Sequence, residues 1–520
     1  MAVSLSINGH TTEPTPGLSL FDHAERLGIA VPTSCHKQGK CRECIVEVTE
    51  GMDCLSAPTP EERHLTANFR LSCRTLVTAP AAIQCHTMRR GQLRIETKGL
   101  DCALAHEPAP GHGIAMDLGT TTIVLRLYNL ETGALVAETS LENPQRFGGS
   151  DVMSRIHYDT NHPGRLLMRT LAGYLTRAIV EFPVDPQAIN EMVVVGNSTM
   201  RDLFFRKSVY TIGQNPYRSI TEIEMADGKR ATTSLTETGR RCLLPIHPKA
   251  RVWGAPILSG HVGADAAACM LAIDIAHEDR LVAIMDIGTN TELIVGNRHR
   301  ILAASCPAGP AFEGGAIRCG MPALEGAIED VRIADDGSIR LGVIGGVAPT
   351  GICGSGLVDT LSELLRTARM NELGRFEELE LAPGICFTEN DASELAQAKG
   401  ANVAGLQVVC DTCGIDFDDI DVFYLAGGFG RHLKPGASRR IGLIPNLPDS
   451  RIVQAGNAAI EGAAIALLSQ SKRRELEDLV KRVEHCRLET HPRFFDYFVE
   501  GCQFKPMESG AGRPARSATS

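Results

Sequence analysis

The sequence predicts an α/β protein of more than one domain, in which a small N-terminal domain precedes a larger, two-lobed one. Three observations lead to this prediction. The length of 520 residues exceeds what a single hydrophobic core normally supports. Two closely similar segments occur at Ile114–Tyr128 and Val282–Val295. Cysteines at ligand-like spacing are grouped near the N-terminus, between Cys35 and Cys73.

Each of the two similar segments is predicted to be a β-hairpin. An apolar run is followed by Asp-Leu-Gly-Thr or Asp-Ile-Gly-Thr and then by a second apolar run. Asp117 and Asp286 end the first strands, where a carboxylate can hold a hydrated Mg²⁺. Gly119 and Gly288 stand where the backbone turns sharply or a ligand comes close. The turns can also face a phosphate with their N–H groups and with the polar side chains of Thr120, Thr121, Thr289 and Asn290.

The duplication carries more weight than either hairpin, because a single Asp-x-Gly-Thr turn fits many ordinary hairpins. Two copies indicate two related lobes that offer their turns to a shared cleft. A third segment, Asp421–Gly430, combines a buried-looking strand with a glycine-rich turn. Its Gly427, Gly428 and Gly430 leave room for a base or a ribose near the backbone. Together the three segments predict a nucleotide-binding cleft.

These motifs resemble those of the ATPase superfamily that contains acetate and sugar kinases, Hsp70 and actin. Met116–Thr122 and Met285–Thr291 are similar to its two phosphate motifs, and Leu425–Gly430 is similar to its adenosine motif. The resemblance implies a two-lobed, ribonuclease H-like ATPase domain that binds ATP and Mg²⁺. The connecting elements of that superfamily fall at Val193–Asn197 and Gly456–Ala464.

The N-terminal cysteines follow the pattern Cys-x5-Cys-x2-Cys, with a further cysteine in a later segment. Three thiolates on one tight loop and one from a distant segment form the ligand set of a [2Fe–2S] cluster. Gly39 helps the loop to fold, and loop N–H groups can point at sulfur. Zinc is the less favoured alternative, because tetrahedral zinc sites usually use two Cys-x2–4-Cys pairs. The predicted ligands are Cys35, Cys41, Cys44 and Cys73.

Residues 1–90 resemble the adrenodoxin-like ferredoxins, which implies a β-grasp fold. A strand over 2–8, a helix over 18–27 and a strand over 45–49 are expected. The sequence departs from that family at four positions that often hold small residues. Here they hold the large or charged side chains of His36, Lys37, Arg42 and Glu43.

The expected domain order follows from these motifs and from glycine- and proline-rich stretches. It is a ferredoxin-like domain (1–90), a linker (91–112), a first ATPase lobe (113–275), a second lobe with the adenosine motif (276–508) and a disordered tail (509–520). A long amphipathic helix is expected at 164–181. Gly354, Ser355 and Gly356 open another predicted helix, where N–H groups suit a phosphate, although an ordinary strand-to-helix turn explains them equally well.

The composition argues against several classes of protein. A net charge of −10 lacks the electrostatic footprint of a nucleic-acid binder. No apolar run approaches the roughly 18 residues that a membrane span needs. The N-terminus has neither the basic region nor the apolar core of a signal peptide, so a cytoplasmic location is expected. The odd count of 17 cysteines argues against a complete disulfide framework.

The whole arrangement resembles the reductive activators of corrinoid proteins. The resemblance implies an iron–sulfur oxidoreductase that hydrolyses ATP and passes an electron from [2Fe–2S] to the Co(II) of a corrinoid-binding methyltransferase protein, which regenerates Co(I). A methionine synthase is one conceivable partner, an upstream electron donor is required, and a homodimer is one conceivable assembly. Matching segments are the four cysteines, both Asp-x-Gly-Thr turns, Ser259–Cys269, Gly309–Ala316 and Gly351–Gly356. Well-known members have a separate middle domain, which is expected to be missing because only residues 91–112 intervene here.

Three other functions compete with this one. An activator of a radical dehydratase would hold a [4Fe–4S] cluster through cysteines of the ATPase domain, where only Cys353 offers itself. A nucleotide-dependent redox sensor or docking protein would deliver no electron to a low-potential acceptor. A small-molecule kinase would turn over ATP regardless of the cluster.

Overall fold

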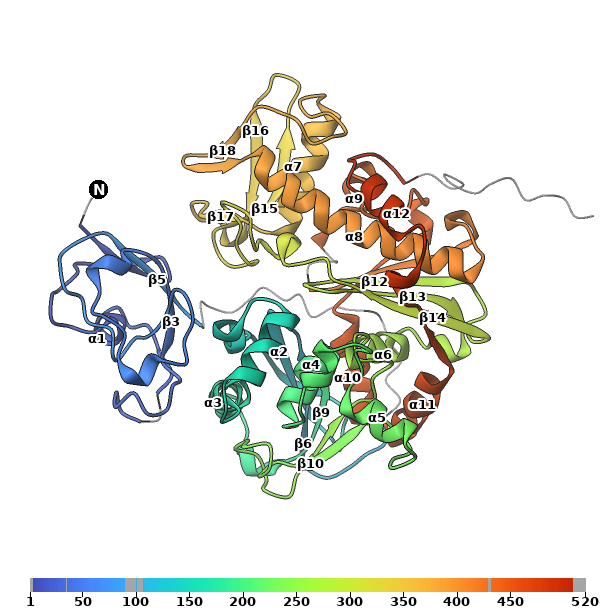
Figure 1. The fold of residues 1–520 in the computed structure, drawn as a ribbon, viewed down its shortest axis with the longest axis horizontal. Helices are drawn as coiled ribbons and strands as arrows, with labels where there is room; N and C mark the ends of the chain where they lie inside the picture. The colour runs from blue at the N-terminus through green and yellow to red at the C-terminus, as the bar shows by residue number, and fades with distance from the viewer. Residues whose placement is uncertain (1–2, 34, 89–99, 101–105, 429–431, 508–520) are drawn as a thin grey trace, which may run out of the picture. The chain divides into compact units, whose positions relative to one another are not determined.

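The structure is a computed structural model that describes residues 3–33, 35–88, 100, 106–428 and 432–507 (Figure 1). The chain divides into two compact units. The first contains Met1–Gln92 and Pro108–Gly254, and the second contains Leu93–Glu107 and Ala255–Ser520. Gly430 and the expected tail, 509–520, lie outside the described residues, as does most of the expected linker.

The N-terminal part of the first unit is a five-stranded sheet of order β2-β1-β5-β3-β4, in which β1 and β5 are parallel. Helix α1 begins at a capping box, since Ser19 and Asp22 each accept the other's backbone N–H at 3.1 Å. Its Leu20, Phe21 and Ala24 are buried. The β-grasp prediction is confirmed, with β1 (Leu5–Ile7), β2 (His10–Thr12), α1 (Leu20–Arg26), β3 (Ile45–Glu50), β4 (Phe69–Leu71) and β5 (Ile83–Thr87).

The rest of the first unit is built on a six-stranded sheet of order β10-β11-β9-β6-β7-β8. The predicted first hairpin is present, because β6 and β7 pair in antiparallel register from His112 opposite Asn129 to Leu118 opposite Ile123. Strand β9 runs parallel to β6 on its other side. The strands are β6 (His112–Leu118), β7 (Thr122–Asn129), β8 (Leu135–Glu142), β9 (Ile189–Val195), β10 (Leu235–Thr238) and β11 (Arg251–Gly254).

Helices α2, α3 and α4 gather beside this sheet (Figure 1). Helix α3 agrees closely with the predicted amphipathic helix, and its Leu167, Leu171 and Leu175 are fully buried. A short 3-10 helix, η3, links the sheet to α2. The bounds are η3 (Pro144–Gly148), α2 (Val152–Asn161), α3 (Leu166–Val180), α4 (Ser198–Phe204) and α5 (Ile220–Ala226).

The second unit has its own six-stranded sheet, of order β21-β20-β12-β13-β14-β22. The second predicted hairpin is formed by β12 and β13, which pair from Val282 opposite Gly296 to Ile287 opposite Thr291. Strand β20 lies parallel to β12, so the glycine-rich turn after β20 emerges beside the hairpin turn. The strands are β12 (Val282–Ile287), β13 (Thr291–Asn297), β14 (Arg300–Cys306), β20 (Val422–Ala426), β21 (Ile452–Gly456) and β22 (Val483–His485).

Two smaller sheets and several helices complete the second unit. Helix α7 packs on β15, and the long helix α8 packs across β13 and β14 (Figure 1). Cys410 and Cys413 lie in the last turn of α8. The remaining elements are β15 (Ala327–Ile333), β16 (Ile339–Val343), β17 (Gly351–Ile352), α7 (Gly354–Arg366), β18 (Leu379–Ala382), β19 (Ile385–Phe387), α8 (Glu389–Cys413), α9 (Pro435–Arg440), α11 (Gln470–Leu479) and α12 (Phe494–Gly501).

Helices α6 (Ala264–Ala272) and α10 (Ala458–Leu468) pack unusually closely in the second unit. A Cβ atom at Gly462 would lie 2.0 Å from the carbonyl oxygen of Ala268, so the contact requires glycine. Helix α6, which falls in the expected first lobe (113–275), therefore packs on α10 within the second unit. None of the described helices is long and apolar enough to span a bilayer.

Candidate functional site

The predicted cluster ligands lie in two pairs. The sulfur atoms of Cys44 and Cys73 are 3.3 Å apart. Cys41 acts as a hydrogen-bond partner of Cys35. Cys44 is buried, whereas the other three thiols keep partial exposure. Two pairs of thiols, one pair for each iron, fit the demand of a [2Fe–2S] cluster.

For Cys35 and Cys73 the charge state also suits metal binding, because the thiolate is the metal-ligating form. The contact with Cys73 and burial instead raise the pKa of the Cys44 thiol well above its usual value. Burial opposes ionisation of Cys35, but N–H groups of Cys41, Lys40 and Gln38 outweigh it and lower the pKa to about 7. The contact with Cys44, helped by the N–H of Gly39, lowers the pKa of Cys73.

The loop between the ligands has an unusual backbone. His36, Lys37 and Arg42 have φ angles of 50°, 65° and 61°, and Gly39 has 73°. Left-handed backbone costs a non-glycine residue about 1–2 kcal/mol, so His36, Lys37 and Arg42 each reduce the folding free energy by about that amount. In return, successive N–H groups form an anion-binding nest facing the sulfur atoms.

The turn of the first hairpin is braced by two asparagines. Asn143, directly after β8, donates its side-chain amide to the Gly119 carbonyl at 2.9 Å and its backbone N–H to the Thr121 carbonyl at 2.7 Å. Asn197 caps α4 and donates to the Thr120 hydroxyl at 2.8 Å. These hydrogen bonds therefore link the turn that carries the predicted phosphate ligands to the end of β8 and to the start of α4.

The second hairpin places Asp286 among other titratable groups. Asp286 lies opposite Glu292 in the strand pairing, and the thiol of Cys269 donates to its carboxylate at 3.3 Å. Burial raises the pKa of Asp286 to about 6. Burial, together with the charges of Asp265 and Asp286, raises the pKa of Glu292 well above its usual value. A divalent cation bound beside these carboxyl groups would stabilise their ionised forms and so lower their pKa values.

The turn of this hairpin contacts a loop that the sequence had singled out, Gly309–Ala316. The Thr289 hydroxyl donates to Glu313 at 2.5 Å, and the N–H of Gly309 donates to the Thr289 carbonyl at 2.9 Å. Within the turn, the N–H of Gly288 donates to the Asn290 carbonyl at 3.1 Å.

The glycine-rich turn lies directly against the second hairpin. Gly427 has a φ of 109°, and a Cβ atom there would lie 2.3 Å from the Ile287 carbonyl oxygen and 3.1 Å from the Asp286 carboxylate. Gly428 has open space where its Cβ would be. The structure therefore brings Asp286, Thr289 and Gly427 into one neighbourhood of the second unit.

Gly354, Ser355 and Gly356 form the first turn of α7, as predicted, and all three are buried. A Cβ atom at Gly356 would lie 2.2 Å from the Ile328 carbonyl oxygen of β15. This glycine is needed for helix packing, which matches the ordinary-turn interpretation, while phosphate binding here stays a prediction.

Sequence reasoning did not assign a role to Asn143, Cys269, Glu292 or Glu313. Asn143 carried a signal, because an Asn-Pro pair after a strand marks a turn. The other three are single polar or thiol residues in apolar or glycine-rich stretches. Glu292 lies in the hairpin itself, whereas only the fold brings Cys269 and Glu313 to it.

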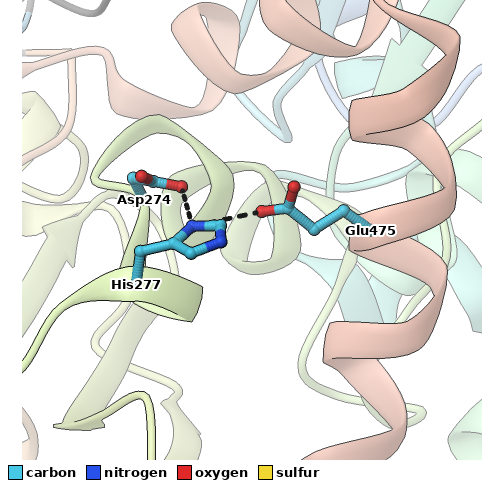
Figure 2. A group of neighbouring side chains, drawn as sticks. All are labelled: Asp274, His277 and Glu475. Atoms are coloured by element: carbon cyan, nitrogen blue, oxygen red, sulfur yellow. Dashed lines mark hydrogen bonds and ion pairs between the residues drawn. The ribbon is translucent and has the colours of Figure 1, made fainter.

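Asp274, His277 and Glu475 form a separate group at the surface of the second unit (Figure 2). The His277 ring lies 2.9 Å from Asp274 and 3.8 Å from Glu475. The Lys472 ammonium pairs with the same two carboxylates, at 3.3 and 2.8 Å. The Lys472 ammonium already balances the negative charges of Asp274 and Glu475, so the group is an ion-pair network rather than a metal site.

The fold and these sites define a class of protein in which a [2Fe–2S] ferredoxin domain is joined to an ATPase of the acetate and sugar kinase, Hsp70 and actin type. Family comparisons agree with that class. Residues 5–78 match the 2Fe–2S iron–sulfur cluster binding domain, residues 112–278 match the RACo middle region, and residues 280–511 match the C-terminal domain of RACo, the ASKHA domain.

Two curated relatives cover most of the chain. The corrinoid activation enzyme RamQ of Eubacterium limosum is 31% identical over 431 residues, which is 76% of this chain and 70% of that protein. A reductase of the Co(II) methylated amine-specific corrinoid protein, from Methanosarcina barkeri, is 25% identical over 416 residues, covering 75% of this chain and 76% of that one. The chain belongs to the family of reductive activators of corrinoid proteins.

A solved structure, a reductive activator for corrinoid, iron–sulfur protein, has the same fold. Its TM-score is 0.71 at 23% identity, covering 98% of this chain and 99% of that one. The expectation that the middle domain is missing was wrong, since the RACo middle region matches residues 112–278. The stretch expected to be the first ATPase lobe, 113–275, coincides with that middle region and carries its own hairpin and six-stranded sheet.

Proposed function

We propose that this protein uses ATP to reduce the Co(II) corrinoid of a partner methyltransferase protein to Co(I). The observation that carries the proposal is the combination, on one chain, of paired thiols in an N–H nest with two Asp-x-Gly-Thr hairpins. When bound by Cys35, Cys41, Cys44 and Cys73, the cluster supplies a one-electron carrier.

The residue roles belong to the proposal. Asp117 and Asp286 would organise Mg²⁺ and the water that attacks ATP. For Asp286, burial beside Glu292 raises the pKa, and a bound cation would stabilise its ionised form. The phosphates are held by hydroxyl, amide and N–H groups of the two hairpin turns, which contain Gly119, Thr120, Thr121, Gly288, Thr289 and Asn290. The first turn of α7, with Gly354, Ser355 and Gly356, contributes further N–H groups. Adenosine approaches Gly427 and Gly428, with Gly430 completing the motif.

The partner in this proposal is the corrinoid-binding subunit of a methyl-transfer system, of which a methionine synthase is one example. The electron comes from an upstream donor, and a homodimer is the assembly we expect. A cytoplasmic location is part of the proposal, because ATP and a pool that keeps cysteines reduced are found there.

An activator of a radical dehydratase is disfavoured by Cys353. Its thiol is buried and donates to the Ile328 carbonyl at 3.4 Å, and burial raises its pKa. A thiol that is held in this way is poorly placed to ligate a cluster at a subunit interface.

The test is an anaerobic assay in which the reduced protein is mixed with a Co(II) corrinoid protein, with and without MgATP, while Co(I) absorbance is followed. We expect an ATP-dependent rise that disappears in Cys73→Ser and Asp286→Ala variants. Cys54→Ser, outside the ligand set, is the matched control and should behave like the wild type. An intact cluster and bound ATP without any Co(I), tested across several corrinoid partners, would favour the redox-sensor function instead.

A further inference from the structure

A five-residue segment of the first unit, Asn143–Phe147, has contacts of different kinds at its two ends. At its start, Asn143 holds the Gly119 and Thr121 carbonyls of the phosphate-type turn, at 2.9 and 2.7 Å. Pro144 then begins the short helix η3, and the Asn143 side chain caps it by accepting a backbone N–H at 3.0 Å. The segment is therefore short and conformationally restricted.

The other end of the segment contacts the ferredoxin domain. The Phe147 carbonyl accepts a hydrogen bond from the Thr66 hydroxyl at 2.7 Å. The Arg146 guanidinium lies 3.5 Å from the Glu47 carboxylate. The Phe147 ring packs edge-on against His64, with ring centroids 6.1 Å apart. The same five residues thus contact both the predicted nucleotide turn and the domain that carries the cluster ligands.

Helices α2 and α3 extend this contact to the ligand loop itself. The Tyr174 hydroxyl donates to the Glu43 carbonyl at 2.8 Å, and the Tyr158 hydroxyl donates to the His64 carbonyl at 2.5 Å. Both tyrosines are almost fully buried. Glu43 stands between the ligands Cys41 and Cys44 in the sequence.

The contact is continuous with the hydrophobic core rather than a few isolated bonds. Buried apolar residues of the ferredoxin domain and of the six-stranded-sheet domain belong to one cluster. At Gly173 a Cβ atom would lie only 3.1 Å from the Glu43 side chain, so helix α3 approaches the ligand loop closely.

We infer that Asn143–Phe147 couples nucleotide binding at the Gly119–Thr121 turn to the docking of the ferredoxin domain. A ligand that shifts the turn must shift Asn143, and the restricted helix η3 passes the displacement to Arg146 and Phe147. Nucleotide then changes the balance between docked and released states of the cluster domain. This inference rests on the proposed nucleotide site, and it adds the route by which that site acts on the electron carrier.

The experiment measures ATP binding by calorimetry and backbone hydrogen exchange by mass spectrometry, on the full chain with its cluster. In the wild type we expect MgATP to change exchange in residues 40–48 and 60–68. A Thr66→Val and Tyr174→Phe double variant removes two docking hydroxyls with little change in shape. It should bind ATP like the wild type but lose the response in both ferredoxin segments.

The matched control is Thr176→Val, since Thr176 lies on the same helix but donates to Ala172 of that helix at 2.8 Å. This variant should keep the full response to MgATP. Bound ATP without any change of exchange in residues 40–48 and 60–68 of the wild type would overturn the inference alone. Failure of the wild type to bind ATP would overturn the proposed function as well.

Discussion

Asp286→Asn should make the nucleotide-free protein more stable while it abolishes ATP-dependent reduction. In the structure, burial raises the pKa of Asp286 from 3.8 to about 6. At about 1.4 kcal/mol for each pKa unit, ionising this carboxyl at pH 7 costs about 3 kcal/mol of folding free energy. This figure is an upper value, because the side chain keeps some solvent contact.

The pH dependence follows from the sign of the shift. The folded state holds the proton of Asp286 more tightly than the unfolded state, so stability is lost as pH rises from about 4 to about 6. An asparagine side chain does not ionise, and its carbonyl oxygen can still accept a hydrogen bond from the Cys269 thiol. The advantage of the variant should therefore be largest at pH 7 and should fade toward pH 4.

Differential scanning calorimetry on the nucleotide-free protein, repeated across this pH range, would measure the effect. The exposed Asp418→Asn is a suitable control, since it removes one negative charge of the same unit without any burial. An Asp286→Asn protein no more stable than the wild type at pH 7, or one whose advantage persists at pH 4, would refute the reasoning. A stabilised variant that still reduces Co(II) with ATP would refute the proposed role of Asp286.

Two further comparisons test the nucleotide sites. Gly427→Ala should destabilise the protein by at least about 1–2 kcal/mol, because φ is 109° and the Ile287 carbonyl lies within 2.3 Å of the new methyl group. Gly428→Ala should have the same free energy of unfolding as the wild type, because no atom lies within 4 Å of the added methyl group. Its affinity for ATP, measured by calorimetry, should be lower. Asn197→Ala should lower the free energy of unfolding by about 2 kcal/mol, because it removes a helix cap and a buried hydrogen bond. The same variant should bind ATP more weakly. The control Asp151→Ala removes the cap of α2 and the hydrogen bond from the Ser154 hydroxyl. Unchanged ATP affinity in both variants would contradict the role of Asn197.

Local sequence patterns predicted much of the fold. Both hairpins, the buried strand before Gly427 and helix α3 appear where apolar periodicity and turn residues placed them. These features are encoded within a few residues, since the alternation of a strand and the sharp turn at an Asp-x-Gly-Thr sequence need no distant partner. The ligand spacing from Cys35 to Cys44 is local in the same sense.

Local patterns did not decide two features of the domain organisation. The middle domain was expected to be missing, whereas residues 112–278 match it, because the resemblance of the first hairpin to a phosphate motif dominated the interpretation of that stretch. Residues 255–275 group with the second unit through the contact of Ala268 with Gly462, which only the folded chain brings together.

The sequence by itself determined the kind of chemistry this protein carries. Thiols at cluster spacing and carboxylates at the ends of strands depend on residue type and short spacing alone. Tertiary structure decided the environments of these groups. The raised pKa of Asp286 comes from burial, which outweighs the hydrogen bond from Cys269 of helix α6, and Asn143 and Tyr174 act through contacts with distant segments. Burial and long-range hydrogen bonds depend on how the whole chain packs, which no short stretch of sequence records.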